Sequence, residues 1–386
     1  MTLQQQSLQL WLKQEVESRR EALIRQLGTV VRTRFQDGSL IDEWMEPFRR
    51  LCVKIQAMQS AGNKRPIAFV HVSWLRSWLR QGKMLCSLEA YDDTWYLDRT
   101  SCMEIFEVPW LSDHVTTYYQ AIESTRKLVD KNIPHTESFR ILMEDAAVAG
   151  QYVVHIVRAM ASRMAACAEF QQVRRADDFR IRAGEYMDLS EDVWVELNEP
   201  VDAAAVHQWL ESKDGSLYRY QDWRGVHLGG GDYESSDLAY THLTSSHLSN
   251  CCFRKSICVG VDFSNSRMQQ IDLAQSVIYD ANFSGCDLQG ANFQEAAGGE
   301  PIILEGQVLG VFGVNFAGAN LQNANLLFTD LTHACFENAN MNGAKVIASQ
   351  SASWSLSEEQ KQQIMWMEED EQGNFVQVRH LEYGRE

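Results

Sequence analysis

The sequence predicts an α+β chain in three parts: a mostly α-helical N-terminal domain, a parallel β-helix and a C-terminal helical cap. Two observations predict the β-helix. An apolar residue recurs at every fifth position from Trp223 to Phe293, and the series restarts in a shifted frame from Phe316 to Val346. A helix repeats at about 3.6 residues and a strand at about 2, so this period requires a chain that turns every five residues. Helical spacing of apolar residues in the first half predicts the helices.

The N-terminal domain is expected to cover residues 1–215 and to be mostly helical, with at most a small hairpin. Apolar residues three, four and seven apart predict a helix over Leu3–Phe35, which Asp37-Gly38-Ser39 ends. Ser39 with Asp42 indicates the N-cap of a second helix, which Pro47 would kink or restart. Further helices are expected at residues 114–132, 136–170, 190–192 and 200–212, and short strands at residues 67–72 and 94–98.

Eight of the eleven tryptophans lie in this first half. Trp74 and Trp78 are spaced to share one helix face, with Arg76 and Arg80 beside them. One interpretation is a contact surface for a protein or ligand, where Trp and Arg are enriched. The other is a core helix with solvated arginines, and the sequence leaves both open.

The β-helix is expected at residues 216–347, with 22 pentads. The best-formed ones are Ala-Asn-Phe-Ser-Gly (281–285) and Ala-Asn-Leu-Gln-Asn (319–323). They resemble the pentapeptide-repeat family, whose pattern is Ala-(Asp/Asn)-Leu-x-x. The resemblance covers about a third of the chain and implies a right-handed, four-sided parallel β-helix with four pentads per coil. The expected structural core is Phe253, Phe263, Leu273, Phe283, Leu288, Phe293, Phe316, Leu321, Leu326, Leu331 and Phe336.

Between the two series, residues 294–313 break the period and contain several glycines and Pro301. We expect a loop that leaves one corner of the solenoid. Such insertions often lie on the binding face of a repeat protein; a tolerated loop without function is the other interpretation.

Residues 348–386 are expected to cap the rod, because a solenoid end exposes apolar side chains and unpaired backbone groups. Ser357 and Gln360 predict a capping box that begins a helix with Ile364, Met365 and Trp366, and residues 374–378 resemble a final strand. The family resemblance implies a second role for this helix, pairing two rods into a homodimer; a simple monomer cap is the alternative.

The charge of the chain is negative and unevenly spread. The net charge is -17, and residues 221–347 contain 13 acidic and 5 basic residues. An acidic rod repels nucleic acid but suits a protein with a basic surface; ordinary solubility is the alternative explanation. The predicted partner-contacting residues are the outward acids Asp222, Asp232, Asp237, Asp262, Asp272, Asp280 and Asp287.

These observations favour a non-enzymatic scaffold that binds another protein, without direct contact to nucleic acid or membrane. The family resemblance implies a narrower alternative, a DNA mimic that binds and protects a type II topoisomerase. A second alternative is an enzyme housed in the helical domain, although phosphate-loop, nucleophile-elbow and zinc-protease motifs are missing. Histidines such as His227 and His247 recur in outward columns, which is typical of a solvated ladder rather than a metal site. We therefore expect no catalytic residue, cofactor or metal.

The nine cysteines follow no disulfide or zinc spacing, which favours a reducing compartment. The opening residues Met1-Thr-Leu-Gln lack the basic and apolar regions of a signal peptide. The most apolar run, Ala146–Val157, is too short to span a membrane. We expect a cytoplasmic protein.

Overall fold

The computed structural model describes residues 3–197, 201–213, 218–304, 307–369 and 375–377. The chain divides into two compact units. The first comprises Met1–Asn198 with Ile303–Val308, and the second comprises Glu199–Ile302 with Leu309–Glu386.

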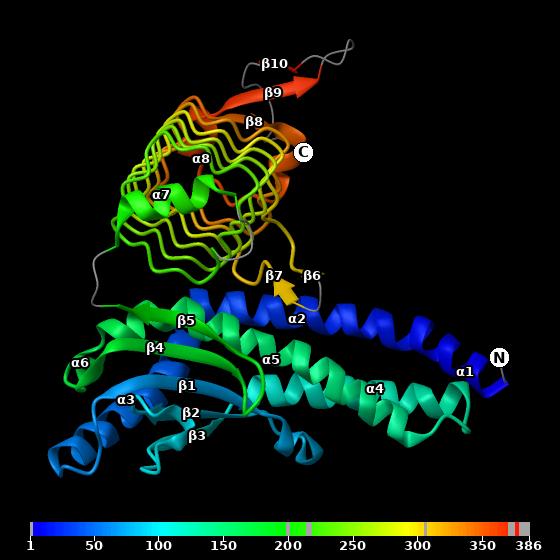
Figure 1. The fold of residues 1–386 in the computed structure, drawn as a ribbon. Helices are drawn as coiled ribbons and strands as arrows, with labels where there is room; N and C mark the ends of the chain where they lie inside the picture. Colours follow the sequence, from blue (N-terminus) through cyan, green and yellow to red (C-terminus); the bar gives the residue numbers. More distant parts are fainter. Residues whose placement is uncertain (1–2, 198–200, 214–217, 305–306, 370–374, 378–386) are drawn as a thin grey trace. The chain divides into compact units, whose positions relative to one another are not determined.

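The first unit is rich in helices, as expected (Figure 1). The predicted N-terminal helix is confirmed as α1 (Leu3–Trp11) and α2 (Glu17–Gln36), joined by a π-helical turn. Pro47 lies inside α3 (Ser39–Ser60) without ending it. The predicted N-cap at Ser39 is wrong: Gly38 precedes the helix at φ +80°, and the Asp37 carboxylate accepts the Ser39 N–H at 2.8 Å. The later helices are α4 (Pro109–Val129), α5 (His135–Ala166) and α6 (Ala168–Gln171).

A five-stranded sheet, which the sequence analysis did not foresee, joins these helices. Its order is β3-β2-β1-β4-β5, with β1 parallel to β4 and the other neighbours antiparallel. Helix α5 packs on β1, β4 and β5, and α3 packs on β2 and β3. The predicted helix at residues 190–192 is wrong, because these residues begin β5. The strands are β1 (Ile67–Leu75), β2 (Leu85–Tyr91), β3 (Met103–Glu107), β4 (Arg175–Glu185) and β5 (Ser190–Glu196).

Two local predictions fail near the sheet. Residues 94–98 form a 3₁₀ turn instead of a strand, because the Asp92 carboxylate accepts the Thr94 N–H at 2.9 Å and Trp95 adopts φ +55°. The predicted Trp74–Trp78 helix face is also wrong. Trp74 belongs to β1, whereas Trp78 lies in the following 3₁₀ helix, Arg76–Gln81. The indole of Trp74 packs so closely on α5 that a Cβ at Gly150 would collide with it.

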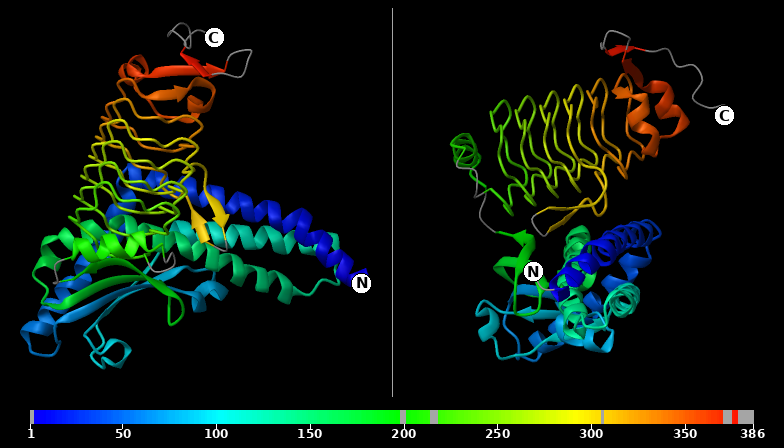
Figure 2. Two further views of the ribbon diagram at one scale, coloured as in Figure 1. Left: turned by 45° about the horizontal axis from the view of Figure 1, so that its top comes forward. Right: turned by 90° about the vertical axis from the view of Figure 1, so that its right-hand side faces the viewer.

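The second unit begins with α7 (Ala203–Glu211), whose N-cap Asp202 accepts the N–H groups of Ala204 and Ala205. A stack of coils follows, seen from the side in Figure 2. Parallel bridges join residues 20 apart, such as Asp222 with His242, and four such columns run around each coil. The coils therefore have four sides, as the family resemblance implies.

Each corner of a coil uses a residue with left-handed backbone two places after the large inward side chain. Gly225 at φ +72° and Asn250 at φ +60° are residue types that accept this conformation readily. Tyr240 at φ +63° shows that the coil imposes it on other side chains as well.

The insertion starts later than predicted. One further pentad continues through Ala297, which bridges Val277 below it and Asp330 above it. Its central position is Gly298, where a Cβ would lie 2.5 Å from Val314, so Val314 fills the space of the missing side chain. The insertion itself contains the paired strands β6 (Ile302–Leu304) and β7 (Gln307–Leu309).

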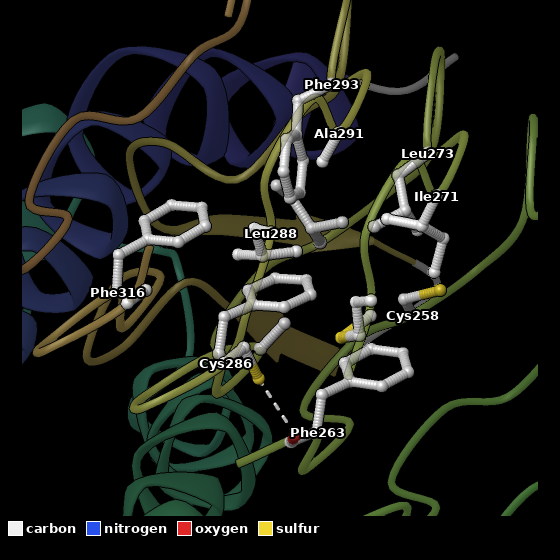
Figure 3. Close-up of a cluster of buried hydrophobic side chains, with 14 of the residues drawn as sticks. Cys258, Phe263, Ile271, Leu273, Cys286, Leu288, Ala291, Phe293 and Phe316 are labelled. Carbon is white, nitrogen blue, oxygen red and sulfur yellow. Dashed lines mark hydrogen bonds between the residues drawn. The ribbon is translucent and has the colours of Figure 1, made fainter. Parts of the chain in front are cut away.

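The interior of the coils is a column of apolar side chains (Figure 3). All eleven predicted core residues are at most 1% exposed. Phe263, Phe283, Phe316 and Phe336 stack with ring centroids 5.1–5.4 Å apart and planes within 10°. Several small inward residues donate to carbonyls of the preceding coil: the Cys286 thiol donates to the Phe263 carbonyl at 2.9 Å (Figure 3), and the Ser276 hydroxyl donates to the Phe253 carbonyl at 2.7 Å.

After the last coil come β8 (Lys345–Ile347), α8 (Glu358–Gln363), β9 (Met365–Glu369) and β10 (Phe375–Gln377). The Ser357–Gln360 capping box is confirmed. Met365 and Trp366 lie in β9, so placing them in the helix was wrong. Trp354 stacks on Phe336 at 5.3 Å, and the Gln360 amide donates to the Phe336 and Ala339 carbonyls. Pairing of two chains through α8 stays a prediction.

Candidate functional site

The outward side chains of the β-helix form ordered rows because they also build its corners. An Asp or Asn stands directly before most of the large inward residues. Its side-chain oxygen accepts a hydrogen bond from the backbone N–H of the residue two places further on. Asp262 accepts from Ser264, Asp272 from Ala274 and Asn315 from Ala317, each at 3.0 Å. Asp or Asn at this position therefore stabilises the turn, although His247, Arg267 and Val277 occupy the same position in other pentads.

The same side chains bond from coil to coil. The Asn282 amide donates to Asp262 at 2.9 Å, and Asn315 donates to Asn282 at 3.1 Å. Asn292 donates to Asp272 at 3.0 Å, and Asn320 donates to Asp287 at 2.9 Å. These ladders hold the outward polar groups at the spacing of the strands, about 4.8 Å. The result is a rigid polar surface with little side-chain entropy to lose on binding.

The seven acids predicted to contact a partner are distributed around the coil rather than gathered on one side. Asp222 and Asp262 share one column, Asp232 and Asp272 share another, and Asp287 and Asp237 lie on the remaining two. Several already have basic partners. The ion pairs are Asp222 with Arg224 at 2.5 Å, Asp232 with Lys213 at 3.0 Å, Asp237 with Arg219 at 2.5 Å and Asp272 with Arg254 at 3.3 Å.

Asp280, the seventh predicted contact, holds the returning end of the insertion. Its carboxylate accepts the backbone N–H groups of Gly310, Val311, Phe312 and Gly313 at 2.7–3.1 Å. This arrangement anchors the chain where it re-enters the repeat. The repeat pattern offered no sign of it, because the acceptor and its donors are separated by the insertion.

One side of the rod is apolar, which the sequence analysis missed. Ala239, Tyr240, Val259 and Tyr279 form a buried cluster with Leu309 of β7. Ile257 and Val277 occupy the outward column position that holds Asp or Asn in most pentads. The available signal was the apolar character of outward residues that recur at intervals of 20.

The sheet of the first unit carries a group of buried polar side chains, which the sequence analysis did not identify because it missed most of the strands. His71 on β1 lies between Glu89 on β2 and Arg182 on β4. The Tyr96 hydroxyl meets His71 Nδ1 at 3.1 Å, and the Tyr91 hydroxyl donates to Glu89 at 3.0 Å. The alternation of polar and apolar residues along residues 69–73 and 85–91 was the available signal.

These groups are buried and their pKa values are displaced. Burial, with a smaller contribution from Arg182, lowers the pKa of His71 to about 4, so that the imidazole is neutral at pH 7. Burial raises the pKa of Glu89. In the described part of the chain, His71 Nε2, Ser73 Oγ and Ser87 Oγ are buried without a hydrogen-bond partner.

The low pKa of His71 makes the first unit sensitive to acid. An unfolded histidine binds its proton near pH 6.5, so the stabilisation is complete above about pH 6.5 and is lost as the pH falls toward 4. We expect the free energy of unfolding to drop by up to about 3 kcal/mol across this range because of His71. Urea unfolding at pH 7 and at pH 4.5 should show that the free energy of unfolding drops less in His71→Gln than in the wild type. In the matched control His247→Gln, on the rod, the free energy of unfolding should drop as much as in the wild type. Equal drops in all three proteins would show that His71 is not the source of the acid sensitivity.

Metal-binding clusters and membrane-spanning helices are both missing from the described residues. They contain no group of three or more His, Cys, Asp or Glu side chains placed to hold a metal ion. No helix among them is both long and apolar enough to cross a bilayer.

Comparison with known proteins identifies the repeat. The family model described as pentapeptide repeats matches residues 256–294 and 312–345 in eight copies. No curated protein matches the chain.

Solved structures of repeat proteins are also similar to the chain. A pentapeptide repeat protein (Rfr23) from the cyanobacterium Cyanothece 51142 is 18% identical, with 36% of this chain and 94% of that chain covered and a TM-score of 0.25. QnrB1, a plasmid-mediated fluoroquinolone resistance protein, is 14% identical, with 34% of this chain and 70% of that chain covered and a TM-score of 0.23. HetL, involved in heterocyst differentiation regulation in Nostoc sp. strain PCC 7120, is 16% identical, with 38% of this chain and 96% of that chain covered and a TM-score of 0.12. The assignment of the repeat thus stands on the repeat sequence itself.

Proposed function

We propose that this chain, whose residues 256–345 carry pentapeptide repeats, is a non-enzymatic scaffold that binds a protein with a basic surface through the outward ladders of its β-helix. The observation that carries the proposal is the fixed geometry of these ladders, in which Asp and Asn side chains bond both to their own turn and to the neighbouring coil. A rigid array of acceptors is suited to a partner whose Lys and Arg side chains match its spacing.

The distribution of charge favours a general protein partner over a DNA mimic. DNA presents a phosphate charge at every step along both strands. Here Arg224, Arg254 and Lys255 interrupt the acidic columns, and each is paired with a rod carboxylate. Net negative charge over residues 221–347 remains the one feature that supports the narrower hypothesis of topoisomerase binding.

The role of the acids in the turns limits how the ladder can be tested. Changing Asp to Lys would remove the acceptor that stabilises the turn as well as reverse the charge, so a loss of binding would not separate charge from fold. Changing Asp to Asn removes the charge and keeps the oxygen, as natural Asn residues do at positions 282, 292 and 315. A variant with Asn at the five positions 222, 232, 262, 272 and 287 is therefore expected to fold.

We expect this five-site Asn variant to bind its partner at least about tenfold more weakly at low salt, because electrostatic attraction speeds association by factors of ten or more. Affinity capture from native lysate at graded salt, followed by titration of the recovered protein, measures the change. A control with the same change of charge replaces the helix-surface residues Glu15, Glu21, Glu46, Glu137 and Glu144 by Gln, and should bind as the wild type does.

The alternatives predict different results. Equal binding by both variants would exclude the acidic ladder as the contact. Direct, salt-sensitive binding of a purified type II topoisomerase that DNA displaces would favour the DNA-mimic hypothesis.

A further inference from the structure

A cavity of about 720 Å³ opens in the first unit, between the 3₁₀ helix Arg76–Gln81, the middle of α4 and the beginning of α5. Its volume lies within the range of pockets that hold small molecules, roughly 300–1,000 Å³. It is separate from the β-helix and from the His71 group, since none of their residues lines it. The repeat-based function does not use it.

The inner wall of the cavity is apolar. Leu79, Met84, Val115 and Leu142 line it and are each at most 5% exposed, and the ring of Phe139 completes this wall. An aliphatic chain placed there would be removed from water, and this burial of apolar surface would favour binding. Polar ligands without an apolar part would not use this wall.

The rim carries the positive charge of Arg80. Arg80 lies with its guanidinium carbon 5.1 Å from the centroid of Phe139 and, among the described residues, forms no ion pair with a carboxylate. His135 lies opposite, with its Nε2 3.1 Å from the Tyr119 hydroxyl. No Asp or Glu belongs to the described lining, although the chain carries a net charge of -17.

Acids beside the lining residues already have basic partners: Glu107 pairs with Lys83, Glu137 with Arg140 and Glu123 with Arg126. Glu123 accepts hydrogen bonds from Arg126 at 2.6 Å and from Ser138 at 2.5 Å. These contacts, with the charge of Arg126 and the smaller influence of His135, hold its pKa at about 2, so it remains ionised and occupied.

The beginning of α5 adds a second, independent attraction for an anion. His135 and Thr136 are the first two residues of this 32-residue helix and both line the cavity. Pro134, which precedes them, provides no side-chain cap, and its carbonyl accepts the Glu137 N–H at 3.0 Å. The helix dipole favours a negative charge at this position, where the Glu137 carboxylate is paired with Arg140.

We propose that this cavity binds a small amphipathic carboxylate, such as a medium-chain aliphatic acid. The carboxylate meets Arg80 and the first turn of α5, and the chain packs along Leu79, Val115 and Leu142. The site would make binding of a small acid a second property of the protein, beyond the proposed scaffold function and independent of it.

Isothermal titration of the full chain with octanoate tests the site, with octanamide as the uncharged analogue. We expect octanoate to bind in one site and octanamide to bind at least about tenfold more weakly, because a hydrogen bond to a charged group contributes more than one between neutral groups. Arg80→Gln should weaken octanoate binding by a similar factor, and Arg80→Lys should recover part of it. Arg80 is exposed, so neither change should affect folding.

Lys83→Gln serves as the control, because Lys83 is a nearby cation that pairs with Glu107 and does not line the cavity. The proposal is overturned if octanoate does not bind, if octanamide binds equally well, or if Arg80→Gln and Lys83→Gln weaken binding to the same extent. Since none of these variants alters the β-helix, failure here leaves the scaffold proposal standing.

Discussion

Replacing Phe283 by alanine is expected to lower the free energy of unfolding of the β-helix by about 3–5 kcal/mol. Phe283 is fully buried and lies in the middle of the aromatic column, 5.1 Å from Phe263 and 5.2 Å from Phe316. Its ring also meets the edge of Phe293 at 5.4 Å. The loss combines the transfer of the ring with a cavity that the surrounding coils cannot close, because their backbone bonds fix the coil spacing.

Chemical denaturation followed by far-UV circular dichroism measures this loss. Phe328→Ala is the matched control: Phe328 is 38% exposed on the outside of the rod, so the same chemical change should cost far less. A similar loss in both variants would show that the stacked column contributes no special stability.

The second large effect is expected in the first unit, from Asp98→Ala. Lys64 and Asp98 form an ion pair at 2.6 Å, with side chains that are 1% and 3% exposed. Asp98 also accepts the N–H groups of Asp92 and Thr100. Removing the carboxylate leaves a buried ammonium without its partner, which we expect to cost about 3–5 kcal/mol.

Hydrogen exchange across residues 92–100 and urea unfolding of the full chain report this change. Asp93→Ala is the control, because Asp93 and its partner Arg65 are both more than half exposed and such pairs contribute about 1 kcal/mol or less. Replacing both members by apolar residues, as Lys64→Met with Asp98→Leu, should recover only part of the loss, because the Asp92 and Thr100 N–H groups still lose their acceptor. If Asp98→Ala matched Asp93→Ala, the buried pair would not be what holds the 92–100 segment.

For the predicted acidic contacts, the sequence predicted the position of each side chain but not its bonding partners. Their outward positions in the repeat follow from the period alone. Their hydrogen bonds and ion pairs do not follow from the period. Asp272 accepts hydrogen bonds from Ala274 and Asn292 and pairs with Arg254. Asp280 accepts four backbone N–H groups at the end of the insertion. A carboxylate that is needed by the fold is a less available contact than the same residue on an open surface.

The sheet of the first unit was largely missed for a physical reason. Strand β1 pairs with β4, about a hundred residues later in the chain, and no local pattern specifies that pairing. Trp95, Tyr96 and Leu97 have high strand propensity, but the Asp92 cap and the left-handed backbone of Trp95 form a turn there. The cluster of His71, Glu89 and Arg182 exists only because three separate strands become neighbours.

The repeat, the apolar column and the outward position of the polar residues could all be predicted from the order of amino acids, because the coils repeat the same contacts at intervals of 20 residues, except across the insertion. The order of the five-stranded sheet, the neutral buried His71, the cavity beside Arg80 and the anchoring role of Asp280 could not. Each of these depends on residues that are distant in the chain and meet after folding. Periodic local order is visible in a sequence, whereas burial, pairing and pKa are properties of the assembled neighbourhood.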